Sequence, residues 1–293
     1  MYALEDKTAN IAAAAADGTR PPLLMGILNV TPDSFSDGGD FVNPRAAIDR
    51  TLQMVEQGAD IIDVGGETTR PGAVAVPEPV ELSRVIPTVR AITSATEVPV
   101  SIDTRRASVA AAAMDAGACI VNDVSGFKFD PGMIPLLGRR RPVAVAMHMR
   151  GTPADMQQHA AYASLTGEII AELMPQLQAV FQAGLPRERL WIDPGIGFSK
   201  TATQCAELLS GIGVFAALGF PVLVGPSRKS LIGAITGRTE PKSRIFGTAA
   251  AVAAAVINGA RIIRVHDVAE MRDVIKVARA IARNVPTETE ARL

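Results

Sequence analysis

Acidic and amide side chains end three apolar segments of this 293-residue sequence. The segments read VPVSIDT, ACIVND and LWIDPGIGFSK, and their polar positions are Asp103, Asn122 with Asp123, and Asp193. One carboxylate can accept two parallel N–H bonds from a planar donor fork, and a second polar group can satisfy the other edge of the same ring. These segments therefore favour a site for a heteroaromatic ring with amide-like N–H groups. A cluster of metal-binding carboxylates is the alternative, and Asp193 could simply cap the turn that follows it.

Positive charge gathers in two segments near the carboxyl-terminal end of the chain. The first, VGPSRKSLIG, leads from an apolar stretch through Lys229 into a helix that begins near Ser230. A helix amino terminus with a hydroxyl group and a lysine is an anion site. The second, IIRVHD, places Arg264 and His266 on one face of a strand, where the pair suggests phosphate binding. A solvated basic turn and a structural histidine are the alternatives.

Two glycine-containing loops carry further polar groups. The segment MGILNVTPDSFSDGG passes from Asn29 into a polar stretch with Asp33, which is either a lid or an ordinary connection rich in turn-forming residues. The segment DVGGETTRPGA offers the hydroxyl of Thr69 and the guanidinium of Arg70 just before Pro71. This density of donors favours an anionic ligand over a plain glycine turn.

Eight short apolar segments, rich in valine and isoleucine, must position these polar groups. Alanine-rich stretches with a helical period separate the segments, which is the pattern of parallel strands joined by crossover helices. Near-equal spacing repeated eight times favours a single closed (β/α)8 TIM-type barrel over an open doubly wound sheet. The predicted strands are 23–29, 61–64, 98–103, 119–123, 143–148, 190–193, 222–225 and 262–266.

Glycines mark the ends of the predicted helices. Helices at 45–57, 106–116 and 244–258 are followed by Gly58, Gly117 and Gly259, as expected because glycine readily adopts the left-handed conformation that ends a helix. In a barrel of this kind, active groups lie at the carboxyl ends of the strands and in the loops that follow them. The polar residues described above all fall at those places, and charged groups buried there need a ligand or a partner.

Composition excludes several classes of function. With 48% hydrophobic and 20% charged residues, the chain can bury one large core and is not disordered. A formal net charge of -1 without a basic stripe argues against nucleic-acid binding. Apolar runs fall well short of the roughly 20 residues that span a bilayer, so no membrane association is expected. Only 2 cysteines and no evident signal peptide predict a cytoplasmic protein.

The chain is expected to form one domain with short additions at its ends. We expect a flexible amino-terminal extension at 1–22, the barrel at 23–284 and a polar tail at 285–293. The extension carries no motif to which the sequence assigns a role.

Eight motifs in order resemble the dihydropteroate synthase family of pterin-binding barrels. They are MGILNVTPDSFSDGG, TTRPGA, SIDT, ND, MHM, DPGIGFSK, GPSRKS and RVHD, and the match covers about residues 23–282. Each motif is weak alone, but eight in order at barrel-strand intervals are specific. The resemblance implies condensation of 6-hydroxymethyl-7,8-dihydropterin pyrophosphate with p-aminobenzoate, Mg²⁺ as cofactor, competition by sulfonamides and assembly into a homodimer.

The resemblance also implies roles for individual residues. Pterin would be held by Asp103, Asn122, Asp193 and Lys229, with Met147 lining the site. Pyrophosphate would be bound by Asn29, Thr69, Arg70, Arg264 and His266, and Mg²⁺ would lie near Asn29. Thr69, Pro71, Phe198 and Ser230 would shape the p-aminobenzoate site, and Asp33, Arg70 and Lys229 would be the catalytic groups.

Two other functions fit parts of the pattern. A pterin-dependent methyltransferase uses a similar barrel, but it would not need GPSRKS and RVHD for a pyrophosphate group. A barrel that binds pterin without turnover would not need to retain Asp33, Arg70, Lys229 and His266. Both therefore fit the sequence less well than the synthase.

Overall fold

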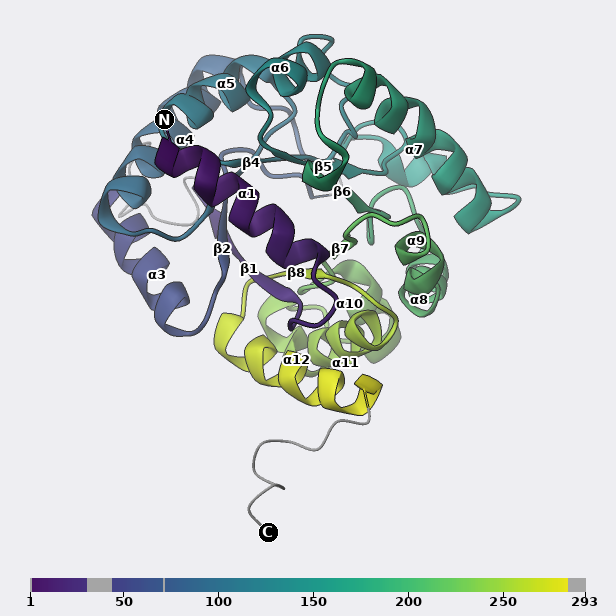
Figure 1. The fold of residues 1–293 in the computed structure, drawn as a ribbon. Coiled ribbons are helices and arrows are strands. Elements are labelled where there is room, and N and C mark those ends of the chain that lie inside the picture. Colours follow the sequence, from purple (N-terminus) through teal and green to yellow (C-terminus); the bar gives the residue numbers. More distant parts are fainter. Residues whose placement is uncertain (1, 31–43, 71, 284–293) are drawn as a thin grey trace.

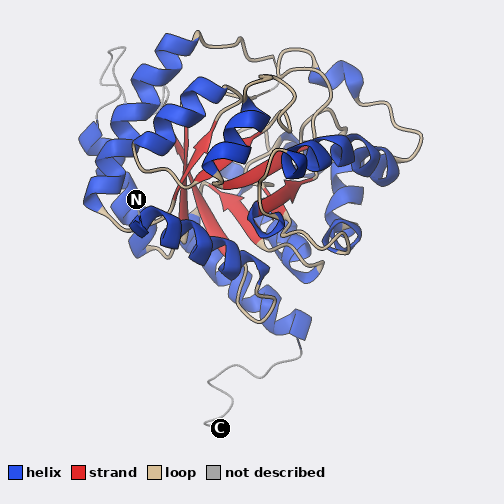
Figure 2. Ribbon diagram, turned by 45° about the horizontal axis from the view of Figure 1, so that its top comes forward, coloured by secondary structure: helices blue, strands red, loops and turns tan. Residues whose placement is uncertain are grey.

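Eight parallel strands form the centre of the computed structural model, which describes residues 2–30, 44–70 and 72–283 (Figures 1 and 2). The strands follow the order β6-β5-β4-β3-β2-β1-β8-β7, and a bridge between Ile192 and Val222 brings the two edges together. The predicted TIM-type barrel is confirmed, and the predicted strands differ from the observed ones by at most two residues at either end. The strands are β1 Leu23–Asn29, β2 Ile61–Gly65, β3 Val100–Asp103, β4 Ile120–Asp123, β5 Val143–Met147, β6 Leu190–Asp193, β7 Leu223–Val224 and β8 Ile262–Val265.

Helices surround the barrel and connect its strands (Figure 2). Gly58, Gly117 and Gly259 have φ values of +96°, +105° and +98°, so each takes the left-handed conformation that the sequence predicted after its helix. The helices around the barrel are α3 Pro44–Glu56, α4 Glu78–Ala95, α5 Ala107–Asp115, α6 Met133–Arg140, α7 Leu165–Gln182, α8 Ala202–Ser210, α9 Ile212–Ala216, α10 Ser230–Thr236, α11 Ile245–Ile257 and α12 Val268–Arg283. None of the helices in the described ranges combines the length and the apolar character needed to cross a bilayer.

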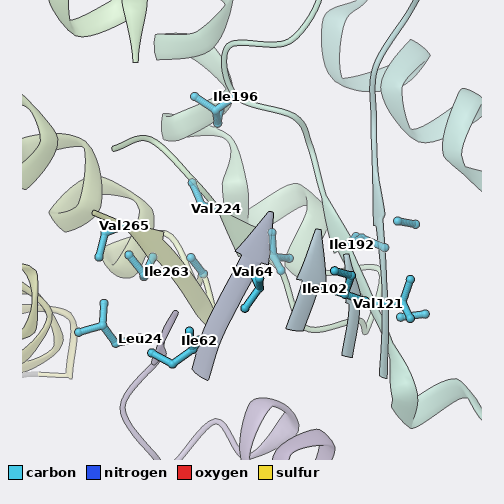
Figure 3. Packing of buried hydrophobic residues seen from close by; sticks show 14 of the residues in the cluster. Leu24, Ile62, Val64, Ile102, Val121, Ile192, Ile196, Val224, Ile263 and Val265 are labelled. Atoms are coloured by element: carbon cyan, nitrogen blue, oxygen red, sulfur yellow. The ribbon is translucent and has the colours of Figure 1, made fainter. Parts of the chain in front are cut away.

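Two separate apolar layers result from the alternation of side chains along each strand. Residues such as Leu24, Ile62 and Val64 pack outward against the helices, and Figure 3 shows part of this outer layer. Their neighbours Met25 and Ile61 point inward and fill the barrel with a second cluster. The inner cluster occupies the amino-terminal half of the barrel, which leaves the carboxyl ends of the strands for polar groups.

Helix α1, Tyr2–Ala16, closes the amino-terminal end of the barrel (Figure 1). Ile11 and Ala15 of this helix belong to the same buried cluster as Met25 and Trp191 inside the barrel. The expectation of a flexible extension at 1–22 is therefore corrected by the structure. The physical reason is that the apolar strand ends at the barrel base need a cover, and the alanine-rich face of α1 supplies one.

Polar contacts fix α1 in this position. Glu5 pairs with the guanidinium of Arg189, which precedes β6, and this ion pair lowers the pKa of Glu5 below its usual range. The guanidinium of Arg261, which precedes β8, donates from Nε to the carbonyl of Ala15 at 3.0 Å. The bond from Arg261 satisfies a carbonyl at the carboxyl end of the helix, where no further helical turn follows.

Replacing Ala15 by glutamate is expected to lower the free energy of unfolding by about 2 kcal/mol or more, because a carboxylate would be forced against the apolar barrel. The same replacement at Ala13, which is exposed on the same helix, should change it by less than about 0.5 kcal/mol. Urea unfolding followed by circular dichroism measures both values. Equally small effects at the two positions would contradict the packing of α1 against the barrel.

Candidate active site

Polar side chains meet at the carboxyl ends of neighbouring strands. In the strand register Gly65 lies beside Asp103, and Asp103 lies beside Asn122. Met147 lies beside Asp193 in the same way. Asp103, Asn122, Met147 and Asp193 thus come from consecutive strands β3 to β6 and share one end of the barrel, as the sequence predicted.

Arg264 of β8 crosses the barrel mouth and joins two carboxylates. Its Nε lies 2.6 Å from Oδ2 of Asp63, and one terminal nitrogen lies 2.8 Å from Oδ2 of Asp103. The amide nitrogen of Asn122 donates to the same Asp63 oxygen at 3.3 Å. Burial raises the pKa of Asp103, against the opposing effect of Arg264, and the nearby Asp63 carboxylate adds to the rise. The arginine therefore compensates two buried carboxylates at once.

Asp63 is a residue to which the sequence assigned no role. It is completely buried at the middle of β2, and its Oδ1 has no hydrogen-bond partner among the residues that the structure describes. The signal for it was its place near the end of a predicted strand. Its partner Arg264 lies 201 positions away in the chain, and no sequence pattern indicates that pairing.

Asp193 and Lys229 approach the same region from β6 and the start of α10. Oδ1 of Asp193 accepts the N–H of Gly195 at 2.7 Å, and burial raises the pKa of this carboxyl. Burial also lowers the pKa of Lys229 to about 8, although the carboxylate of Asp193 opposes this effect. The Lys229 ammonium donates to the carbonyl of Ile196 at 2.6 Å and lies 3.9 Å from the centroid of the Phe198 ring.

Sulfur-containing and aromatic side chains form an apolar wall beside these charges. Met147, Met149, Met156, Val124 and Phe198 make up a small buried cluster of their own. Methionine side chains adapt to flat ring systems and contact them favourably through sulfur. Two of the predicted binding residues, Met147 and Phe198, thus lie together in a surface suited to an aromatic ligand.

His266 follows β8 and is uncharged in this setting. Its backbone N–H donates to the Ser227 hydroxyl oxygen at 3.2 Å, and the same hydroxyl lies 3.0 Å from Nδ1 of the ring. The hydroxyl can donate to Nδ1, and in that tautomer the ring proton is on Nε2. Burial lowers the pKa of His266 to about 3, with smaller contributions from the positive charges of Arg228, Arg264 and Arg70. The ring can bind an anion as a neutral N–H donor.

The loop after β2 is fixed at both of its ends. Oε1 of Glu67 accepts the N–H of Val76 at 2.9 Å, and Oε2 pairs with Arg105 at 2.9 Å. Arg106 donates to the carbonyl of Val76 at 2.6 Å. Within this loop Thr69 is half-buried and Arg70 is exposed, and the positive charge of Arg70 contributes to lowering the pKa of His266.

Two further predicted residues lie at the ends of secondary-structure elements. Asn29 ends β1 and is half-buried, and Ser230 begins α10 and is exposed. Asp33 and Pro71 lie outside the described residues. Within the described ranges there is no group of three or more His, Cys, Asp or Glu side chains that could hold a metal ion. The individual roles of the predicted site residues stay predictions.

Comparisons with known proteins identify the family. A family model described as pterin binding enzyme matches residues 25–266. The dihydropteroate synthase of Synechocystis sp. is 46% identical over 260 residues, which cover 89% of this chain and 90% of that protein. A Xanthomonas albilineans dihydropteroate synthase structure with 4-aminobenzoic acid is 42% identical, with a TM-score of 0.85 and coverage of 92% and 95%. The structure of that enzyme in complex with 7,8-dihydropteroate gives a TM-score of 0.82 at 39% identity, with coverage of 92% and 96%.

These similarities extend over nearly the whole barrel, including every strand that contributes to the mouth. The family resemblance predicted from the eight motifs is thereby confirmed. The chain belongs to the dihydropteroate synthase family of pterin-binding enzymes.

Proposed function

We propose that this chain joins 6-hydroxymethyl-7,8-dihydropterin pyrophosphate to p-aminobenzoate, giving 7,8-dihydropteroate and pyrophosphate. The observation that carries the proposal is the convergence of Asp103, Asn122, Asp193 and Lys229 at one barrel mouth, next to the anion-binding donor of His266. The X. albilineans relatives, solved with 4-aminobenzoic acid and with 7,8-dihydropteroate, support the same pair of substrates.

The pterin ring matches the polar groups of the mouth. Its N3–H and 2-amino groups form a donor fork for a carboxylate, a role that suits Asp193 with its fixed side-chain orientation. Asn122 and Asp103 can satisfy the remaining edge, and the Lys229 ammonium can donate to the ring carbonyl. Met147 lies beside Asp193 and supplies an apolar contact for the ring face.

The pyrophosphate group matches the donors of the neighbouring loops. Arg70 and Thr69 offer a guanidinium and a hydroxyl from the loop after β2, and neutral His266 offers its Nε2–H. Arg264 already forms ion pairs with Asp63 and Asp103. We therefore assign it mainly to keeping the pterin-binding carboxylate of Asp103 ionised. Donors aimed at the departing oxygen stabilise the charge that develops there.

Mg²⁺ fits this site as an ion carried by the substrate. The ion commonly uses one or two protein oxygens together with substrate phosphates and water, so the single amide oxygen of Asn29 is a sufficient protein ligand. When bound, Mg²⁺ neutralises charge on the leaving pyrophosphate.

The arylamine is already neutral near pH 7 and needs no strong base before it attacks. The bond from the exocyclic carbon of the pterin to pyrophosphate breaks first, and the electron-rich ring stabilises the positive charge that remains on that carbon. The amine nitrogen then forms a bond to this carbon and loses a proton. Phe198 supplies an aromatic surface for p-aminobenzoate, and Thr69, Pro71 and Ser230 are the other residues assigned to this substrate. Asp33 is the proposed stabiliser of positive charge on the pterin carbon.

The exposed faces of α11 and α12 support a homodimer. Phe246 is 88% exposed and Ile257 is 45% exposed on α11, and Val277 and Ile281 are also exposed on α12. These two helices pack side by side (Figure 1). Four exposed large apolar residues on adjacent helices are the kind of patch that marks a protein interface.

The proposed location of the enzyme is the cytoplasm. Cys119 and Cys205 are both buried and unpaired, and burial raises the pKa of each thiol. Unreactive reduced thiols agree with a reducing compartment.

Replacing Asp193 by asparagine should lower kcat/KM for the pterin substrate by about 100-fold or more, because an amide cannot accept both N–H bonds of the donor fork. Coupled measurement of dihydropteroate and pyrophosphate tests this, with wild-type protein expected to form the two in equal amounts. Asp60→Asn is the matched control, since this aspartate precedes β2 at the opposite end of the barrel, where its Oδ2 accepts the N–H of Leu24 at 2.8 Å. Wild-type protein that forms no dihydropteroate would refute the proposed function.

The activity should fall at alkaline pH with an apparent pKa near 8. The Lys229 ammonium donates to the pterin carbonyl, and its pKa is lowered to about 8, so the active cation is present below this pH and lost above it. An ordinary lysine would place the same fall at about 10.4. The dependence of kcat/KM on pH measures it, and the residual activity of Lys229→Met should lack this alkaline limb.

Replacing Phe246 by glutamate is expected to convert a dimer into a monomer, because a charge would enter the apolar patch that the interface would bury. Light scattering coupled to size-exclusion chromatography gives the mass of each form. Leu52→Glu, on the exposed face of α3, is the control that should leave the dimer intact. A monomeric wild type would exclude this interface.

A further inference from the structure

The loop after β6 takes its shape from side chains rather than from regular secondary structure. Lys229 donates to the carbonyl of Ile196, and Gly197 donates to Sγ of Cys205 at 3.2 Å. Tyr162 donates to the carbonyl of Ser199 at 3.1 Å. Ser199 itself has a φ of +46°, an unfavourable region for a residue other than glycine. This conformation therefore depends on the side chains that surround the loop.

Lys200 is the more deeply buried of the two lysines that contact this loop. It is 3% exposed, and its Nζ donates to the carbonyl of Phe198 at 2.9 Å. Nζ also lies 3.0 Å from Nδ1 of His148 and forms no ion pair among the described residues. Burial lowers the pKa of Lys200 to about 7. An apolar side chain would fill the same space without this cost, so stability alone does not account for a lysine.

His148 links Lys200 to the outer helices. Its side chain is completely buried, and Nε2 lies 3.0 Å from Oε2 of Glu172 on α7. Burial and the nearby Lys200 charge lower the pKa of His148 to about 3, so the neutral ring accepts from Lys200 at Nδ1 and donates to Glu172 at Nε2. Arg150 pairs with the same carboxylate, with its Nε 2.9 Å from Oε1. These hydrogen bonds connect Lys200 to helix α7.

Phe198 is held from two directions as a result. Its carbonyl accepts from Lys200, and its ring lies 3.9 Å from the ammonium of Lys229. The hydrogen bond to its backbone carbonyl fixes the position of Phe198, and the contact with the Lys229 ammonium fixes the orientation of its ring. A second connection joins the loops after β5 and β6, because the N–H of Arg150 donates to the Ser199 hydroxyl at 3.0 Å.

We propose that Lys200 is a positioning residue for p-aminobenzoate, which acts by fixing Phe198 through its carbonyl and through the bond to His148. The inference rests on the proposed function of the site. Lys200 contacts neither substrate in this role. Its contribution is to hold the loop in the binding conformation before the arylamine arrives, which avoids the loss of affinity that ordering it on binding would bring.

Lys200→Met keeps the length and apolar stem of the side chain but removes its N–H donors. We expect KM for p-aminobenzoate to rise roughly tenfold, because the loop must then be ordered during binding. KM for the pterin substrate and kcat should each stay within about twofold. Steady-state kinetics with each substrate varied in turn measures the three constants. Hydrogen exchange at 195–200 should become faster in the variant.

Arg189→Met is the matched control. Arg189 is a buried cation that donates to the carbonyl of Arg141 at 2.5 Å, and it precedes the opposite end of the same strand β6. Its loss should lower the melting temperature without changing KM for p-aminobenzoate. A Lys200→Met variant that matches this control, with reduced stability and unchanged KM, would show that Lys200 is merely structural and would overturn the proposal.

Tyr162→Phe gives a second measurement if Lys200→Met does not fold. It removes the hydroxyl that donates to the Ser199 carbonyl at 3.1 Å and lies 3.4 Å from the Ser199 hydroxyl oxygen, and we expect a rise of roughly threefold in the same KM. An unchanged KM in this folded variant would count against the whole scheme of loop positioning. An inactive wild type would refute the proposed function, whereas exchange at 195–200 would still decide whether Lys200 holds the loop.

Discussion

The pairing of Arg264 with Asp63 and Asp103 is the interaction on which the barrel mouth depends. Two carboxylates buried next to each other would repel strongly, and they would not both stay ionised without a cation between them. Adding Asp193 and Lys229 gives three acidic groups against two basic ones around the same space. These five side chains therefore carry one more negative than positive charge when all are ionised, and Oδ1 of Asp63 has no hydrogen-bond partner among the described residues. A ring that presents several N–H groups is the kind of ligand that offsets such an excess, which agrees with pterin as the substrate.

The two ends of the barrel differ in polarity and in function. One end is apolar and contributes stability, and the other is polar and forms the candidate site. On β2, Ile61 belongs to the apolar interior, while Asp63, two residues further on, enters the polar mouth. The apolar half is sealed by α1, so it contributes stability through burial. The polar half is costly to bury and is held by ion pairs and loop contacts. Changes that alter the mouth therefore need not disturb the packing that keeps the barrel closed.

Most of the fold could be predicted from the sequence, because buried parallel strands form short apolar runs and glycines end their connecting helices. The polar residues at the strand ends were also readable, since every parallel strand of a barrel delivers its last side chains to one mouth. The role of α1 was not readable, because an alanine-rich segment shows little contrast between its faces. Contacts across the barrel, such as Asp63 with Arg264 and His148 with Lys200, depend on strand stagger and loop path, and local patterns carry neither.

The loop after β6 shows why such contacts matter for function. Two lysines hold neighbouring carbonyls of this loop, Lys229 at Ile196 and Lys200 at Phe198, and neither of them forms an ion pair in the described structure. Each therefore carries a cost of burial that the nearby Asp193 carboxylate only partly offsets, and this cost appears as a lowered pKa. Folding alone would favour replacing both with apolar side chains. Their joint placement on one strained loop concentrates electrostatic cost where a substrate must be held, as expected if the loop is kept ready for binding rather than optimised for stability.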